Sequence, residues 1–104
     1  MNEQIVNRRG IPYITGTASS DGTVATIALP DHAFRWLMVK GIMLLNLATD
    51  LSAATQTNTV VISVNSETKP LLGQDNAQAT VADVTVPRVY EIFYDKSAGV
   101  LQLI

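Results

Sequence analysis

Short runs in which hydrophobic residues alternate with polar or small ones recur along the chain, separated by turn residues. Residues 10–18 and 23–29 flank Ser19-Ser20-Asp21-Gly22, whose Asp-Gly pair is a hairpin signal. Within the second run, Ala25, Ile27 and Leu29 alternate with Val24, Thr26 and Ala28. Such a period of two places alternate side chains on opposite faces of a strand. The pattern predicts a β-hairpin in this part of the chain.

A second hairpin is predicted at the end of the sequence. Residues 89–95 place Tyr90, Ile92 and Tyr94 on one face, and the turn 96–99 leads into a last strand that runs to Ile104. Turn signals recur at intervals of roughly ten residues, which is typical of β-sandwiches and barrels.

The segment Phe34–Leu47 is compatible with two structures. A helix would align Phe34, Leu37 and Leu45 on one face, whereas a strand would alternate Met43, Leu45 and Leu47 with polar and apolar positions. Gly41 costs on the order of 1 kcal/mol relative to alanine in a helix interior but is tolerated at a bend of a strand. The strand over about 37–47 is therefore favoured, with a helical turn at 31–35 left open.

The middle of the chain predicts further strands. Residues 59–64 are rich in β-branched residues and apolar on nearly every position, which indicates burial on both faces or an interface. Asn65–Lys69 is predicted to turn, with Asn65 in a positive-φ or side-chain-bonded conformation. A short extended piece follows at Pro70–Leu72, and 79–86 is predicted to be extended.

These elements predict an all-β fold: an antiparallel, jelly-roll-like β-sandwich of about seven or eight short strands. Residues 1–9 show no periodicity and are predicted to form a flexible N-terminal arm. Residues 10–104 are predicted to form the single β-sandwich domain.

Composition adds a prediction about association. The chain of 104 residues is 47% hydrophobic but only 15% charged, with a net charge of −2, whereas roughly 25% charged residues are usual. A surface with few charges is often completed by self-association. The absence of a basic stripe argues against nucleic-acid binding, and the longest apolar run, interrupted by Arg35, Lys40 and Asn46, is too short for a membrane-spanning helix.

Candidate chemistry is sparse in the sequence. His32 is the single histidine and there is no cysteine, so no nucleophile–base set and no zinc-ligand set can be assembled. The isolated aspartates are expected to be turn residues whose carboxylates bond their own backbone. These aspartates are Asp21, Asp50, Asp75, Asp83 and Asp95. The sequence therefore predicts a protein that is not an enzyme and has no cofactor, catalytic residue or metal site.

The aromatic residues allow two interpretations. Phe34, Trp36, Tyr90 and Tyr94 could form a self-association or ligand surface, because aromatic rings present flat apolar faces to sugars or partners. Packing in the core is the favoured alternative for Trp36, Tyr90 and Tyr94.

From Lys40 onward the chain resembles small β-sandwich structural proteins of tailed-bacteriophage virions. The resemblance rests on three segments: Lys40-Gly41-Ile42, the run from Asn58-Thr59-Val60-Val61 through Val64-Asn65 to Lys69-Pro70-Leu71-Leu72, and Tyr90-Glu91-Ile92-Phe93-Tyr94-Asp95 before Gly99-Val100-Leu101. The nearest types are head fibres and capsid decoration proteins, with crAss-like phages as a candidate source.

This resemblance implies a structural protein on the surface of a phage capsid. Such proteins are commonly trimeric and attach through an N-terminal arm to the major capsid protein or another virion protein. Ile5, Arg8, Arg9 and Ile11 would belong to that attachment region. The alternative hypothesis is a carbohydrate- or receptor-binding module of a tail or baseplate, with a host-surface glycan as ligand.

Overall fold

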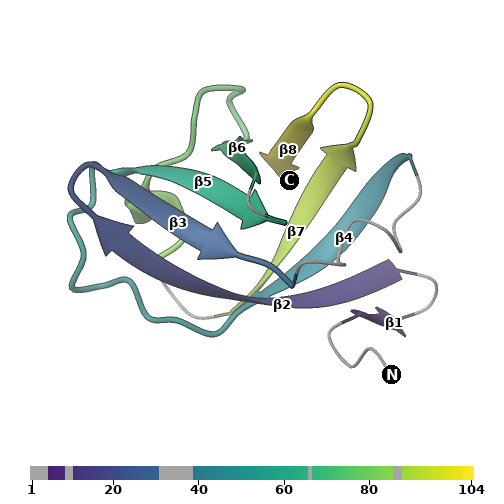
Figure 1. Ribbon diagram of the computed structural model, residues 1–104, viewed down its shortest axis with the longest axis horizontal. Helices are drawn as coiled ribbons and strands as arrows, with labels where there is room; N and C mark the ends of the chain where they lie inside the picture. Colours follow the sequence, from purple (N-terminus) through teal and green to yellow (C-terminus); the bar gives the residue numbers. More distant parts are fainter. Residues whose placement is uncertain (1–4, 9–10, 31–38, 66, 86–87) are drawn as a thin grey trace.

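A computed structural model describes residues 5–8, 11–30, 39–65, 67–85 and 88–104 of the chain (Figure 1). Over these residues the protein is all-β, as predicted, with one short 3₁₀ helix, η2 (Val81–Asp83). The eight strands are β1 (Ile5–Arg8), β2 (Ile11–Asp21), β3 (Val24–Ala28), β4 (Lys40–Leu47), β5 (Thr59–Val64), β6 (Glu67–Leu72), β7 (Arg88–Asp95) and β8 (Val100–Leu103).

The strands close into a barrel, so the predicted antiparallel β-sandwich is wrong. Seven of them form a ring in the order β2-β3-β5-β6-β8-β7-β4, and β4 pairs with β2 to complete it. Three of the seven pairings are parallel: β2 with β4, β3 with β5, and β6 with β8. β1 lies outside the ring and pairs antiparallel with β2.

Two strands close the barrel because each changes its partner along its length. Residues Tyr13–Gly16 of β2 pair with β4, whereas Thr17–Asp21 pair with β3. In the same way β6 pairs with β5 up to Pro70 and then with β8 at Leu71 and Leu72. In Figure 1 the long β2 ribbon passes from beside β4 to beside β3.

Gly16 stands where β2 changes partner. A Cβ built at this position would lie 3.0 Å from Ile27 Cγ2, 3.0 Å from Leu29 Cδ2 and 3.2 Å from Leu45 Cδ1. Residues of β3, β4 and the segment after β3 therefore pack directly on the backbone of Gly16. The missing side chain lets the two halves of the barrel approach each other at this bend.

The core follows the predicted alternation. Ala25, Ile27 and Leu29 are buried in and after β3, and Met43, Leu45 and Leu47 are buried in β4. Tyr90, Ile92 and Tyr94 of β7 are buried as well, which confirms their shared face. The strand predicted over about 37–47 is confirmed over Lys40–Leu47. Residues 31–38, which include the alternative helical turn at 31–35, lie outside the described residues.

The hairpin between β5 and β6 confirms one turn prediction and corrects another. Asn65 has φ 54°, in the left-handed region, as predicted. β6 begins at Glu67, however, so the chain re-enters the sheet earlier than the turn predicted over Asn65–Lys69. A proline is tolerated at position 70 because β6 pairs with β8 only from Leu71 onward. No hydrogen bond to β8 is therefore lost through the missing N–H of Pro70.

The segment after β6 is not the extended strand predicted for 79–86. Thr80 makes only an isolated bridge to Thr59, and the chain then turns into η2. The Asp83 carboxylate accepts a hydrogen bond from the Thr80 backbone N–H at 3.0 Å, which stabilises the turn over a continued strand. Val81 and Val84 are fully buried and close this end of the barrel together with Leu51 and Ala79.

Asn58 connects the loops at the same end. It is a polar residue buried to 5% exposure, and its side-chain Nδ2 donates to Ser20 Oγ at 2.9 Å. Its backbone carbonyl accepts from the Val81 N–H at 2.9 Å. These two bonds join the residue before β5 to Ser20 of β2 and to Val81 at the start of η2.

The predicted flexible arm is in part a strand. Ile5 to Arg8 form β1, in register with β2 from Ile5 opposite Ile14 to Arg8 opposite Ile11. Backbone hydrogen bonding to β2 is the reason, because a short segment with apolar residues can extend an open sheet edge without its own core.

Candidate functional site

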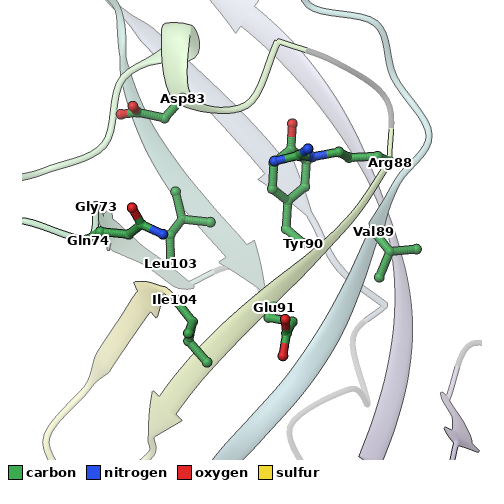
Figure 2. Close-up of a pocket in the computed structure, with 9 residues that line it drawn as sticks. All are labelled: Gly73, Gln74, Asp83, Arg88, Val89, Tyr90, Glu91, Leu103 and Ile104. Atoms are coloured by element: carbon green, nitrogen blue, oxygen red, sulfur yellow. The ribbon is translucent and has the colours of Figure 1, made fainter.

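A polar hollow of about 420 Å³ lies at the end of the barrel where β6 and β8 end and β7 begins. Figure 2 shows Asp83, Arg88 and Glu91 around it, with Gln74 on the side of the loop that follows β6. A second hollow of about 450 Å³ adjoins it and shares Gly73, Gln74 and Asp83. The first hollow is lined by three charged side chains, Asp83, Arg88 and Glu91, all of them exposed, and it is a place to look for chemistry.

Several polar groups in and beside the hollow stabilise the loop and the strand. The Arg88 guanidinium carbon lies 4.8 Å from the centroid of the Tyr90 ring, a cation–π contact visible in Figure 2. Asp83 caps the turn at Thr80. Gln102 Nε2 donates to the Gly73 carbonyl at 3.0 Å and to Asn76 Oδ1 at 2.6 Å. The arrangement is a hydrogen-bonded support for the loop 73–80.

Aspartates elsewhere follow the same structural pattern, as the sequence predicted. Asp50 Oδ1 accepts from the Ser52 N–H at 2.9 Å, and Asp75 Oδ1 accepts from the Ala77 N–H at 3.1 Å. Asp95 Oδ1 accepts from the Ser97 hydroxyl at 2.8 Å, the Ser97 N–H at 3.1 Å and the Ala98 N–H at 3.2 Å. These carboxylates stabilise turns.

Two of these carboxyl groups have lowered pKa values. Hydrogen bonds from the Ser52 backbone and hydroxyl lower the pKa of Asp50. The pKa of Asp95 is lowered chiefly by the Ser97 hydroxyl, then by the Ala98 N–H, and also by the positive charge of Lys40. Both carboxylates are therefore held ionised by the turn they stabilise. Over the described residues, no group of three or more His, Cys, Asp or Glu side chains could hold a metal ion.

Two of the four residues of the predicted aromatic surface are buried. Tyr90 is 6% exposed and Tyr94 is 3% exposed, so both pack in the barrel core, as the alternative interpretation held. Both side chains lie on the inward face of β7, and the Arg88 guanidinium covers the Tyr90 ring where Tyr90 lines the hollow. Phe34, Trp36 and the lone histidine, His32, lie outside the described residues.

The predicted attachment residues are divided between two strands. Ile5 and Arg8 are the ends of β1, and Ile11 begins β2 opposite Arg8. Arg9 lies outside the described residues. The structure thus places three of the four residues in one small hairpin beside the barrel.

An apolar outer surface on β4 and β7 was not predicted. It is called here the outer β4–β7 face and consists of the outward positions Ile42, Leu44, Val89 and Phe93, with Tyr13 of β2 and Ile104 beside them. Ile42 is 43% exposed, Val89 42% and Ile104 52%. The outward positions around β3, β5 and β6 mix polar residues such as Thr26 and Ser63 with apolar ones such as Val24, which is 36% exposed, and Val61. Apolar residues on both faces of 40–47 were the sequence signal that marked this surface.

The fold and its surfaces thus define a small closed β-barrel of mixed strand direction, with a polar hollow at one end and an apolar outer face. A scan against protein-family models, a search of the curated proteins and a search of the solved structures each found no match to the chain. Among the described residues, no helix is long and apolar enough to cross a membrane.

Proposed function

We propose that the protein is a non-enzymatic structural component of a phage particle that self-associates on the capsid surface. The outer β4–β7 face is the observation that carries the proposal. Bulky apolar side chains stand on the outside of the barrel there, and exposed apolar surface of this kind in a small protein with few charges favours burial against another protein. The phage context rests on the resemblance of residues 40–104 to virion proteins.

The polar groups support a structural role as well. The carboxylates of Asp50, Asp75, Asp83 and Asp95 are engaged by backbone N–H groups of their own turns. These carboxylates stabilise the turns of the barrel, as expected for a rigid structural protein.

The resemblance further implies a trimer and attachment to the major capsid protein or another virion protein through residues 1–9. In the barrel this attachment would begin at β1, which has β2 on one side only among the described strands. An edge strand offers backbone groups to a strand of another protein.

Electron microscopy of purified particles tests the proposal. Antibodies raised against the purified protein are expected to label the head surface of phage particles whose genome encodes this chain. Particles assembled with a chain lacking residues 1–9 serve as the control for attachment and are expected to lose the label. Intact particles that never contain the protein would contradict the proposal.

Binding of a host-surface glycan by a tail or baseplate module has weaker support. Two of the four aromatic residues that suggested it, Tyr90 and Tyr94, are buried. The polar hollow in Figure 2 is the feature such a function would use, and its tyrosine ring is covered by Arg88. A glycan array with no bound sugar would remove this candidate.

A further inference from the structure

We propose that the barrel opens locally along one seam, the ladder between β6 and β8, and that the Gln102 side chain holds this seam closed. The seam consists of the pairs Leu71–Leu101 and Leu72–Gln102. This opening is a motion of the single chain, so it does not depend on the proposed self-association. Three features support it: a short ladder, a hollow at each end of the seam, and the hydrogen bonds of Gln102.

The seam is the shortest ladder of the ring. Among the described residues, β6 and β8 share two residue pairs, whereas each other ladder of the ring has at least four. On one side Pro70 precedes the seam, and a proline has no N–H with which to extend the ladder. On the other side β6 ends at Leu72, and the chain turns at Gly73. Few backbone hydrogen bonds therefore hold β6 against β8 (Figure 1).

A hollow lies at each end of the seam. The first has a volume of about 180 Å³ and is lined by Glu67 and Lys69 of β6 and by Val100 at the start of β8. The second is the polar hollow of Figure 2, which is lined by Gly73 after β6 and by Leu103 of β8. Atoms beside a hollow lack packing partners on that side. The contacts between β6 and β8 are therefore concentrated in the short seam itself.

The Gln102 side chain adds two hydrogen bonds to this short ladder. Gln102 is half-buried on the outer side of β8, next to the fully buried Leu101. Its Nε2 donates to the Gly73 carbonyl at 3.0 Å and to Asn76 Oδ1 at 2.6 Å. Both acceptors belong to the turn directly after β6. Gln102 thus joins β8 to the end of β6, where the ladder stops.

The backbone N–H groups of β8 distinguish the seam from the ladder on its other side. The Ile104 N–H donates to the Glu91 carbonyl of β7 at 3.1 Å. Because adjacent residues of a strand direct their N–H groups to opposite edges, the Gln102 N–H also faces β7, whereas those of Leu101 and Leu103 face β6. Opening of the seam therefore exposes the N–H groups of Leu101 and Leu103 and leaves that of Gln102 bonded.

Native-state hydrogen exchange of the full chain tests the opening. We expect the N–H groups of Leu101 and Leu103 to have protection factors at least tenfold lower than that of Gln102, because local opening exposes them without unfolding of the barrel. Equal protection of the three groups would overturn the inference, since β8 would then leave both of its neighbours together.

A substitution tests the role of Gln102. Gln102→Met keeps the length of the side chain and removes both hydrogen bonds, and it is expected to lower the protection of Leu101 and Leu103 by about a further tenfold while leaving Ile92 in the β4–β7 ladder unchanged. Asn46→Leu is the matched control, because Asn46 also joins two strands through its side chain, away from the seam. It is expected to leave the protection of Leu101 and Leu103 unchanged. No effect of Gln102→Met, or an equal effect at Ile92, would overturn the assigned role.

A covalent bond across the seam gives a test that stands even if Gln102→Met fails to fold. The chain has no cysteine, and Leu72 and Gln102 are neighbours across the seam. Neighbouring strands bring such residues within the distance that a disulfide spans, so Leu72→Cys combined with Gln102→Cys can form one. We expect oxidation to raise the protection of Leu101 and Leu103 at least tenfold over the reduced form of the same protein. Equal protection in the two forms would contradict an opening at this seam.

Discussion

Asp95 shows how a single side chain determines the turn between β7 and β8. Its carboxylate receives three hydrogen bonds from Ser97 and Ala98, and its pKa lies below the ordinary value of 3.8. A carboxyl group with a lowered pKa in the folded state stabilises the fold above its ordinary pKa and loses that effect as the pH falls through the lowered value.

We therefore expect Asp95→Asn to lower the stability at neutral pH and to have a diminishing effect in acid. Asparagine can accept the same hydrogen bonds but carries no charge. Chemical denaturation at a series of pH values should show the two proteins converging below the ordinary pKa of the carboxyl group. A difference in stability that stays constant from neutral pH to strong acid would contradict this account of Asp95.

Asn65 shows how the backbone conformation of one residue affects the turn between β5 and β6. At φ 54° it occupies the left-handed region on an exposed turn, so its side chain contributes little to packing. We expect Asn65→Ala to lower the free energy of unfolding by about 1 kcal/mol, because alanine lacks the short polar side chain that lets asparagine adopt the left-handed region. Asn65→Gly is expected to be close to neutral, because glycine has no Cβ to disfavour that region. Thermal denaturation of the two variants checks this. An equal loss of stability in both would show that the left-handed backbone conformation is not the cause.

At the scale of elements, Gly16 is the position on which barrel closure depends most. Gly16→Ala inserts a methyl group against Ile27, Leu29 and Leu45 at 3.0–3.2 Å. We expect a loss of roughly 1–3 kcal/mol in the free energy of unfolding, as for overpacking of a core. Thr17→Ala, at an exposed neighbouring position, is the control and should change stability little. A Gly16→Ala protein as stable as the wild type would mean that the bend has room to adjust.

β1 is dispensable for closure, because the ring is completed by β2 with β4. Deletion of residues 1–9 is expected to leave the barrel folded, with a far-ultraviolet circular dichroism spectrum and cooperative melting like those of the full chain. Loss of cooperative melting in the truncated protein would show that β1 belongs to the folding unit.

The strands were predictable and their partners were not. The period of two along residues 24–29 and 89–95 identifies which side chains enter a core, because alternation is a local property of the chain. The parallel pairing of Ile27 with Ile62 and of Leu71 with Leu101 joins residues far apart in sequence, and nothing local marks it. An equal number of strands could close as a sandwich or a barrel.

At the candidate site the sequence was informative about chemistry and less so about surfaces. The roles of Asp50, Asp75, Asp83 and Asp95 in turns followed from residue type and position. The burial of Tyr90 and the exposure of Val89 depend instead on which side of β7 faces the barrel interior. That side is fixed by the closure of the whole ring.

At the scale of the whole molecule, the outside of the barrel carries several apolar residues. Those of β4 and β7 are Ile42, Leu44, Val89 and Phe93, with the charged Glu91 among them, and Val24 and Val61 point outward from β3 and β5. Apolar surface of this kind is buried when a subunit associates with its own copies. The central claim is therefore self-association.

The most direct test is the mass of the wild-type chain in solution, measured by light scattering during size-exclusion chromatography over a range of loading concentrations. The predicted result is a species of at least twice the chain mass of 11.2 kDa that dissociates on dilution. A mass of one chain at every concentration would contradict the account.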